Sequence, residues 1–203
     1  NKGASLRQEL QGKSRLLAPL LVILVFQIIQ SVTLVTYLPV LLYDEGESFW
    51  LASVSLSVLQ AAGVAGAFFG GTLSDRLGRR LMIFLSILPT AILMLIFLGV
   101  SGWVRFPLLV LLGLTSLSIT PVIMALIQES FPNNRALANG FYMALSFGIR
   151  AIVIVIVGRV GDLFSLRTAF AVAAAVSLLS TPVVYWLPAK AGQEGQPPGA
   201  AAR

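Results

Sequence analysis

Long runs without a charged residue divide this sequence and constrain its fold more than any other feature. Five runs contain no charge, and they are bounded by Arg15 and Asp44, Glu47 and Asp75, Arg80 and Arg105, Arg105 and Glu129, and Arg167 and Lys190. A sixth run, between Arg135 and Arg159, contains Arg150 alone. Each run supplies the roughly 20 apolar residues that cross a bilayer core of about 30 Å. We predict transmembrane spans at about residues 16–42, 49–73, 81–100, 106–128, 136–158 and 168–187.

These spans are predicted to be helices, because hydrocarbon offers no water to satisfy the hydrogen bonds of an irregular backbone. They are too long and too evenly apolar for the strands of a membrane barrel, which alternate over about ten residues. The composition agrees, since 57% of the residues are hydrophobic and 11% are charged, too few to cover the surface of a soluble domain. The predicted fold class is an all-α integral membrane protein with six transmembrane helices.

The chain contains no Cys and no His. A disulfide, a Cys/His zinc site, a thiol nucleophile and a catalytic imidazole are therefore excluded. No span contains paired carboxylates that could form an active site. The sequence thus disfavours an enzyme, and we expect neither a metal nor a cofactor.

The positive charges indicate how the chain is oriented in the membrane. With a cytoplasmic N-terminus, the outer loops contain Arg105, Arg159 and Arg167. The inner segments then contain Lys2, Arg7, Lys13, Arg15, Arg76, Arg79, Arg80, Arg135, Lys190 and Arg203. Such an excess is typical of the cytoplasmic side, so we predict a plasma (inner) membrane protein with both termini cytoplasmic. This placement explains the net charge of +6 without nucleic acid as a partner.

The two ends of the sequence are expected to lie outside the transmembrane bundle of residues 16–187. Residues 1–15 are predicted to be a cytoplasmic linker. Residues 188–203 are rich in Gly, Pro and Ala and are predicted to be a disordered cytoplasmic tail. The chain opens at Asn1 rather than Met, and we interpret it as a piece of a longer protein.

Small residues recur every four positions in the second span, at Ala62, Gly66 and Gly70. This spacing places them on one ridge of a helix, where the missing side chains allow another helix to approach closely. We predict a helix-packing ridge, although the pattern does not identify the partner helix. The alternative is that small residues are simply common in membrane helices.

Directly after this span comes the segment Gly71-Thr72-Leu73-Ser74-Asp75-Arg76-Leu77-Gly78-Arg79-Arg80. Asp75 lies where a helix leaves the membrane and can pair with a basic neighbour or with the positive N-terminus of another helix. Gly78 permits a tight turn, and the arginines favour an anionic cytoplasmic leaflet. A basic loop without a special role is the simpler interpretation.

This segment resembles the signature loop of the major facilitator superfamily, G-x-x-x-D-R-x-G-R-R. Its fixed positions are filled by Gly71, Asp75, Arg76, Gly78, Arg79 and Arg80. Two further segments, Ala125 to Pro132 and Asn139 to Gly148, are similar to the tenth-to-eleventh helix region of the fosmidomycin-resistance-type efflux branch of that family. The resemblance covers residues 16–187.

The resemblance implies that the six spans correspond to helices seven to twelve of a twelve-helix transporter, arranged as two inverted three-helix repeats. The partner would be the N-terminal six-helix half, which Asp75 would contact as part of a gate. The resemblance further implies an antiporter, embedded in membrane lipid, that exports a small molecule by alternating access. No span contains Asp or Glu, so an acid for proton coupling would have to come from the other half.

Polar side chains indicate which helices face the interior. The first span contains Gln27 and Gln30, the second Gln60, and the fifth Ser146 and Arg150. Polar groups in hydrocarbon need a partner or a wet cavity, so these residues are the candidate cavity and substrate-binding set. The third and sixth spans contain neither an amide nor a charge, and we expect them at the periphery. The remaining four should form an exposed concave face that carries Gln27, Gln60 and Arg150.

Arg150 lies about 12 Å from Gly158, where its span ends, at a rise of 1.5 Å per residue. Its side chain therefore cannot easily reach the interface, and burying it costs about 2.5–3.5 kcal/mol on insertion scales. It needs an acceptor. One interpretation is a cavity site for an anionic substrate group. The other is a structural partner, which could be a helix carbonyl, Gln27, Gln60 or an acid in the other half.

Two other functions stay open at this stage. The chain could be a six-helix membrane protein that assists a partner and does not transport, although the gate-like loop and the polar set disfavour this. It could also be a self-contained half-transporter in which two copies assemble, although the opening residue and the unpaired gate loop favour a piece of a longer protein.

The topology predicts opposite accessibility for two loops. Cysteines introduced at Ser74 and at Gly46 should react with a membrane-impermeant thiol reagent from opposite faces of intact cells. Labelling of both positions from outside would contradict the topology and the transporter interpretation with it.

Overall fold

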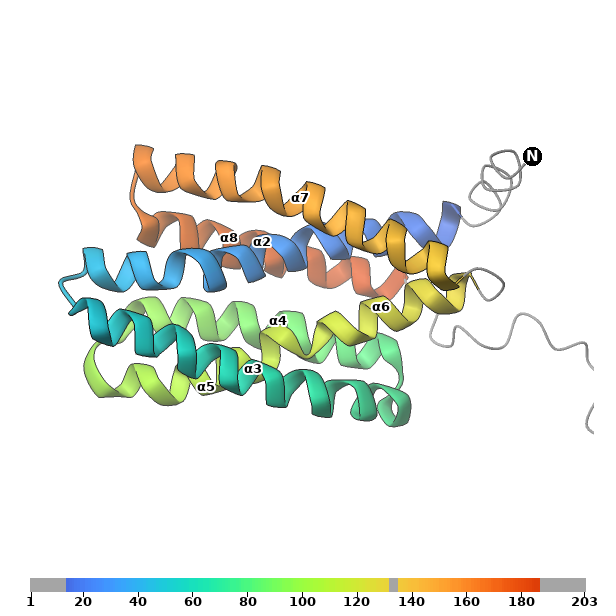
Figure 1. Cartoon of the computed structure of the whole chain (residues 1–203), viewed down its shortest axis with the longest axis horizontal. Coiled ribbons are helices and arrows are strands. Elements are labelled where there is room, and N and C mark those ends of the chain that lie inside the picture. Colours follow the sequence, from blue (N-terminus) through green and yellow to red (C-terminus); the bar gives the residue numbers. More distant parts are fainter. Residues whose placement is uncertain (1–13, 132–134, 187–203) are drawn as a thin grey trace, which may run out of the picture.

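A computed structural model of the chain, shown in Figure 1, describes residues 14–131 and 135–186. The predictions for residues 1–13 and 188–203 concern residues outside these ranges. Within them every element is helical: α2 (Ser14–Asp44), α3 (Phe49–Leu77), α4 (Arg79–Gly99), η1 (Gly102–Val104), α5 (Arg105–Leu117), α6 (Ile119–Ser130), α7 (Arg135–Leu163), α8 (Leu166–Ser180) and η2 (Thr181–Trp186).

Six spans in the described ranges are long and apolar enough to cross a membrane, which confirms the predicted fold class. The second and fifth helices are longer than their predicted spans, because both continue past the apolar segment into charged residues such as Asp75 and Asp162. The α3 helix ends where Gly78 adopts a φ of +89°, a conformation that favours glycine. This turn lets α4 begin at the next residue.

The connections between the spans gather at two ends of the bundle (Figure 1). The α2–α3, α4–α5 and α7–α8 connections lie together, and we call this the Gly46 end. The α3–α4 connection lies at the opposite end with the start of α2 and of α7, and we call this the Gly78 end. Gly46 and the segment Ser74–Arg80 therefore lie at opposite ends, as the topology requires. The segment is helical on both sides of Gly78 and is not an open loop. Ser74 belongs to α3 and is only 1% exposed, so a cysteine at this position would be poorly accessible to a thiol reagent.

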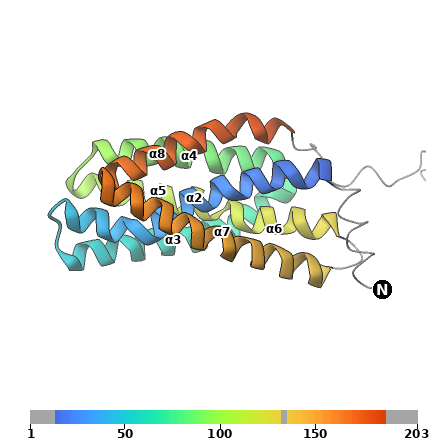
Figure 2. The ribbon, with the colours of Figure 1, turned by 90° about the horizontal axis from the view of Figure 1, so that it is seen from above.

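Figure 2 shows how the helices are layered across the bundle. The α4 and α8 helices pack against each other on one side, and α3, α6 and α7 lie on the opposite side with α2 between the two groups. The third and sixth spans therefore lie on the side away from α3 and α7. Their lack of amides and charges predicted that they would be the most peripheral spans of this chain, and that expectation was wrong, because α4 and α8 are more buried (50% and 39%) than α3 and α7 (33% and 17%). The α2 helix is the most buried of the six spans and α7 the least.

The predicted ridge of small residues packs α3 directly against α5. A Cβ atom added to Gly66 would lie 2.2 Å from the carbonyl oxygen of Leu114. On the facing helix, a Cβ added to Gly113 would lie 2.2 Å from the carbonyl oxygen of Leu59 and 2.8 Å from the Cβ of Ala62. All three distances are far below van der Waals contact, so only glycine permits this approach. The prediction of a packing ridge is confirmed, and its partner is the first half of the fourth span.

The fourth span, predicted as one helix, is broken at Ser118 into α5 and α6. Pro121 explains the break, because proline has no N–H to donate to the carbonyl of Leu117, four residues earlier, and its ring clashes with that carbonyl. Gly70 of α3 packs directly against the break, since a Cβ added to Gly70 would lie 2.6 Å from the carbonyl oxygen of Ser118. The glycine ridge therefore ends at the break.

Hydroxyl groups stabilise the break from the side of α4. The hydroxyls of Ser86 and Ser118 are 2.9 Å apart, and the Thr90 hydroxyl donates to the Thr115 hydroxyl at 2.8 Å. All four residues lie in the middle of the membrane-spanning region, where unsatisfied polar groups are costly. These paired hydroxyls join α4 to both halves of the fourth span.

An ion-pair cluster joins three connections at the Gly46 end. Arg105, which is only 7% exposed, pairs with Glu45 and lies 3.9 Å from Glu47, and its guanidinium stacks 5.3 Å from the ring centre of Phe97. Arg167 at the start of α8 pairs with the same Glu45 at 3.0 Å. We call these residues the Glu45 clamp. The acidic α2–α3 connection thus holds the end of α2 and the starts of α5 and α8 together.

The contact between α3 and α5 predicts unequal effects for the same substitution at two glycines. Gly66→Ala should destabilise the purified protein by about 1–3 kcal/mol, because the added methyl group cannot fit without moving a helix. Gly71→Ala on the same helix is the matched control, since a Cβ there has no neighbour within 4 Å. Thermal unfolding in detergent measures both. Equal melting temperatures for the two variants would contradict the close approach.

Candidate functional site

Two helices flank a face of the bundle that no described helix covers. Both α3 and α7 pack on α2 and on α6 rather than on each other. They lie on the side of the bundle away from α4 and α8 (Figure 2). They are also the two least buried spans. We call the surface formed by α3 and α7, with α2 and α6 behind them, the α3/α7 face.

Gln60 lies on the exposed side of α3, near the middle of the helix. Ser53 and Ser57 are exposed on the same side, and each donates its hydroxyl to a carbonyl of its own helix. The exposed stripe of α3 is therefore partly polar at membrane depth. A glutamine amide has two donors and an acceptor, so Gln60 offers hydrogen bonds to whatever covers this face.

The polar residues of α7 share one side of that helix. Tyr142, Ser146 and Arg150 follow each other at four-residue spacing, which aligns them along the helix axis. Arg150 and Ser146 are half-buried, and the next positions on this side, Val153 and Val157, are buried against the bundle. Arg150 makes no ion pair within the part of the chain that the structure describes. Its positive charge, at the edge of the α3/α7 face, is therefore available to pair with a group outside the described residues.

Gln27 does not lie on an exposed surface, and that expectation was wrong. The residue is only 6% exposed, and its Nε2 donates to the Thr120 hydroxyl of α6 at 3.5 Å. The reason is the break in the fourth span, which brings the start of α6 close to the middle of α2. The contact matches the structural interpretation of a membrane amide that links two helices.

Gln30 is also buried, at 3% exposure. Its Nε2 has no hydrogen-bond partner among the described residues. An unsatisfied buried donor is costly, so Gln30 remains a candidate for binding a group that the chain itself does not supply. The structure therefore brings Ser146 and Arg150 together on α7, places Gln60 on the other flank, and puts Gln27 and Gln30 in the interior.

The signature loop forms a second polar site at the Gly78 end. The Nε of Arg79 lies 3.1 Å from both carboxylate oxygens of Glu129, which ties the start of α4 to the end of α6. Arg79 also lies 3.4 Å from Asp75 and donates to the hydroxyl of Ser74. The side chain of Asp75 is 68% exposed, so it stays accessible to another protein segment.

Sequence reasoning missed three residues that this geometry makes important. Thr120 accepts from Gln27, Tyr142 precedes Ser146 on the polar side of α7, and Glu129 pairs with Arg79. Two of them carried a usable signal, because Thr120 directly precedes Pro121 and Glu129 was part of the junction from Ala125 to Pro132. Their partners could not be read from the sequence, since each lies at least 50 residues away.

Six helices that are long and apolar enough to cross a membrane, in the part of the chain that the structure describes, indicate a multi-pass membrane protein. The family model described as Major Facilitator Superfamily matches residues 20–202, and the chain belongs to this superfamily of membrane transporters. The resemblance found in the signature loop is thereby confirmed. Proteins of this superfamily are in general transporters rather than enzymes.

Two curated proteins are similar to the chain. The uncharacterized MFS-type transporter YfnC of Bacillus subtilis (strain 168) is 33% identical over 100 residues, which cover 49% of this chain and 24% of that protein. The fosmidomycin resistance protein of Escherichia coli (strain K12) is 26% identical over 140 residues, which cover 69% of this chain and 34% of that protein. The chain thus matches about a quarter of the length of the first relative and about a third of the length of the second. No solved structure gives a significant match.

The geometry of the signature loop separates a gate role from a stability role. Asp75→Asn should lower transport by the intact transporter and change its melting temperature little, because the Asp75 carboxylate is 68% exposed and its ion pair with Arg79 joins only the adjoining ends of α3 and α4. Glu129→Gln should lower the stability by up to roughly 1 kcal/mol, the value of an exposed ion pair.

Transport normalised to folded protein and thermal unfolding measure the two effects. If Asp75→Asn leaves transport unchanged, the gate role of this loop is wrong. If Glu129→Gln leaves the melting temperature unchanged, the pair with Arg79 does not hold α4 to α6.

Proposed function

We propose that this chain forms the C-terminal six-helix half of a secondary transporter that works by alternating access and exports a small organic or anionic compound. The observation that carries the proposal is the α3/α7 face, on which Gln60 and Arg150 offer polar groups at membrane depth without a partner helix to cover them. Membership of the superfamily supports transport as the activity.

The α3/α7 face supports a second six-helix half as the partner. A charged side chain within the membrane faces a bundle interior or a water-filled cavity, because contact with lipid costs several kcal/mol. In transporters built from repeats, the substrate site lies near the membrane midplane where the repeats meet. A half that covered α3 and α7 would place Gln60 and Arg150 at such an interface. The relatives are also considerably longer than the parts that match this chain.

Arg150 supports an anionic group on the substrate. A guanidinium keeps its charge in proteins and forms two parallel hydrogen bonds with a carboxylate, phosphate or phosphonate. In a cavity of low dielectric constant this charge attracts anions and repels cations. A cavity residue should also lack an internal ion pair, and Arg150 has none within the described residues.

Export and ion coupling rest on other observations. One relative is named a fosmidomycin resistance protein, and efflux is a common basis of resistance. No Asp or Glu lies inside the predicted spans, so an ion-coupled mechanism takes its acid from the partner half. The Arg-rich Gly78 end faces the cytoplasm of a plasma (inner) membrane protein in this proposal, following the bias of positive charges.

The test of this function is the dependence of transport on substrate charge. Arg150→Gln in the intact transporter should weaken export of an anionic compound much more than export of a neutral one. Arg150→Lys should retain part of the anionic activity, because an ammonium keeps the charge and loses the bidentate geometry. Arg135→Gln, which removes an exposed charge at the start of the same helix, is the control.

Uptake into inverted vesicles, normalised to folded protein, measures these differences. A structural Arg150 would give a different pattern, in which both substitutions lower the folded yield and leave transport per folded molecule unchanged. Equal loss for the anionic and the neutral compound would also contradict the substrate-binding role.

A further inference from the structure

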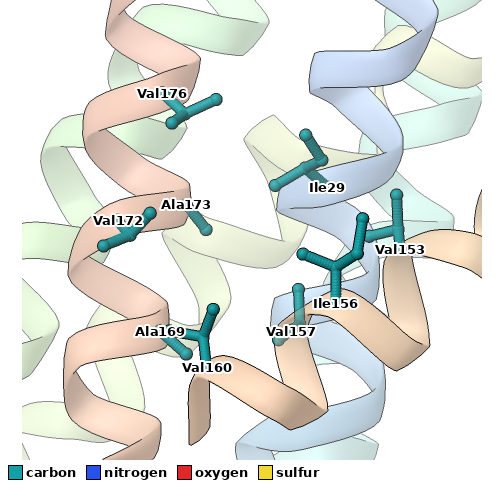
Figure 3. Close-up of a pocket in the computed structure, with 9 residues that line it drawn as sticks. All are labelled: Ile29, Val153, Ile156, Val157, Val160, Ala169, Val172, Ala173 and Val176. Carbon is teal, nitrogen blue, oxygen red and sulfur yellow. The ribbon is translucent and has the colours of Figure 1, made fainter. Parts of the chain in front are cut away.

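A purely aliphatic groove lies between α2, α7 and α8, away from the α3/α7 face. Figure 3 shows its lining side chains converging from the three helices. The groove has a volume of about 160 Å³. Its lining includes Ile29 of α2, Val153, Val157 and Val160 of α7, and Ala173 and Val176 of α8. No lining residue is polar, so the groove has no role in the polar site described above.

The groove runs along the helix axes and lies within one leaflet. Its α7 wall extends from Val153 to Val160 and its α8 wall from Ala169 to Val176, each about 10 Å long at 1.5 Å per residue. A leaflet is about half of the 30 Å hydrocarbon core. Both walls belong to the helix halves next to the Gly46 end, since α7 ends and α8 begins there. Ile156 and Val172 on its rims are 55% and 46% exposed, so the groove opens to the surroundings.

The shape and chemistry of the groove select its occupant. Water would find no hydrogen-bond partner against these side chains, and an apolar cavity of about 150 Å³ in another protein stays dry and holds a molecule as small as benzene. A helix with its side chains is about 10 Å across, so a 10 Å length of helix takes up roughly 800 Å³. This is more than the space in the groove, so we expect no helix of a second copy or of another half to insert here. A segment of a single hydrocarbon chain matches the small volume and the aliphatic lining.

A cation lies beside the groove where it approaches the membrane interface. Arg159 is exposed, one turn beyond Ile156 on α7, and makes no ion pair within the described ranges. Arg167 at the same end is already engaged by Glu45. The carboxylate of Asp162, also exposed, lies outside ion-pair distance of Arg159. Arg159 is therefore the available partner for an anionic headgroup.

We propose that this groove binds one acyl chain of a phospholipid in the leaflet at the Gly46 end, with the lipid phosphate against Arg159. The site is separate from the substrate face and does not depend on the transport proposal. The bound acyl chain fills the gap between α7 and α8. Because α7 is the least buried span, the acyl chain completes the packing of α7 on α2.

The test is lipid photocrosslinking of the purified chain in phosphatidylcholine vesicles that contain phosphatidylglycerol with a diazirine in its acyl chain. Mass spectrometry after proteolysis should locate adducts mainly at residues 153–160 and 169–176. Val160→Phe fills the groove and should reduce these adducts several-fold. Val155→Phe is the matched control on the same helix, because Val155 is 63% exposed and does not line the groove. Val172→Phe repeats the block from α8 if Val160→Phe fails to fold.

The headgroup contact is tested with two probes that carry the same acyl chain. Arg159→Gln should remove the preference for the phosphatidylglycerol probe over a phosphatidylcholine probe, and Arg135→Gln should not. Excess inorganic phosphate should leave the adducts unchanged, because the chain anchors the lipid.

Three results would overturn the proposal. Adducts spread equally over other exposed apolar residues, such as Ile92 and Leu95 of α4, would show ordinary lipid contact. An equal loss of groove adducts in Val160→Phe and Val155→Phe would also show ordinary lipid contact. Adducts on α4 with none in the groove would show that protein covers it.

Discussion

The backbones of α3 and α5 touch along their glycines, and the placement of the other helices depends on this contact. Gly66 and Gly113 bring each helix against a carbonyl oxygen of the other, which no larger residue allows. One side of α3 is therefore buried against α5. Gln60 lies about a quarter turn away from the glycine ridge, on a side of α3 that is exposed. The glycine contact thus decides which surface of α3 is available to a partner or a cavity.

The two ends of the bundle are held by ion pairs of different character. The Glu45 clamp uses Arg105, which is almost fully buried, and joins three connections. The pair between Arg79 and Glu129 at the other end is more exposed and joins two helices. Breaking a buried pair costs more than breaking an exposed one. Of these ion pairs, the one at the Gly78 end, beside the signature loop, is therefore the less costly to break.

Much of the fold could be predicted because its determinants are local. Charge-free runs predicted six helices, and the four-residue spacing of Gly66 and Gly70 indicated a packing ridge. The absence of amides did not make α4 and α8 the most peripheral spans, since both are more buried than α3 and α7. Contacts between distant segments could not be predicted. The burial of Gln27 depends on the break at Ser118, and the clamp depends on loops 60 and 122 residues apart. The roles of Gln60, Ser146 and Arg150 at the α3/α7 face stay predictions.

Solvent accessibility within the membrane tests the central claim most directly, namely that the α3/α7 face lines a water-filled cavity. The chain has no cysteine, so single cysteines can be introduced into the intact transporter at Gln60 and Ser146. Ile92 of α4 and Ala175 of α8 are the control positions, because both are exposed and lie at a similar depth along their helices. A small, charged thiol reagent reacts only in contact with water. A water-filled cavity along the α3/α7 face predicts reaction at Gln60 and Ser146 and none at Ile92 and Ala175. Equal reaction at all four positions, or none at Gln60 and Ser146, would contradict it.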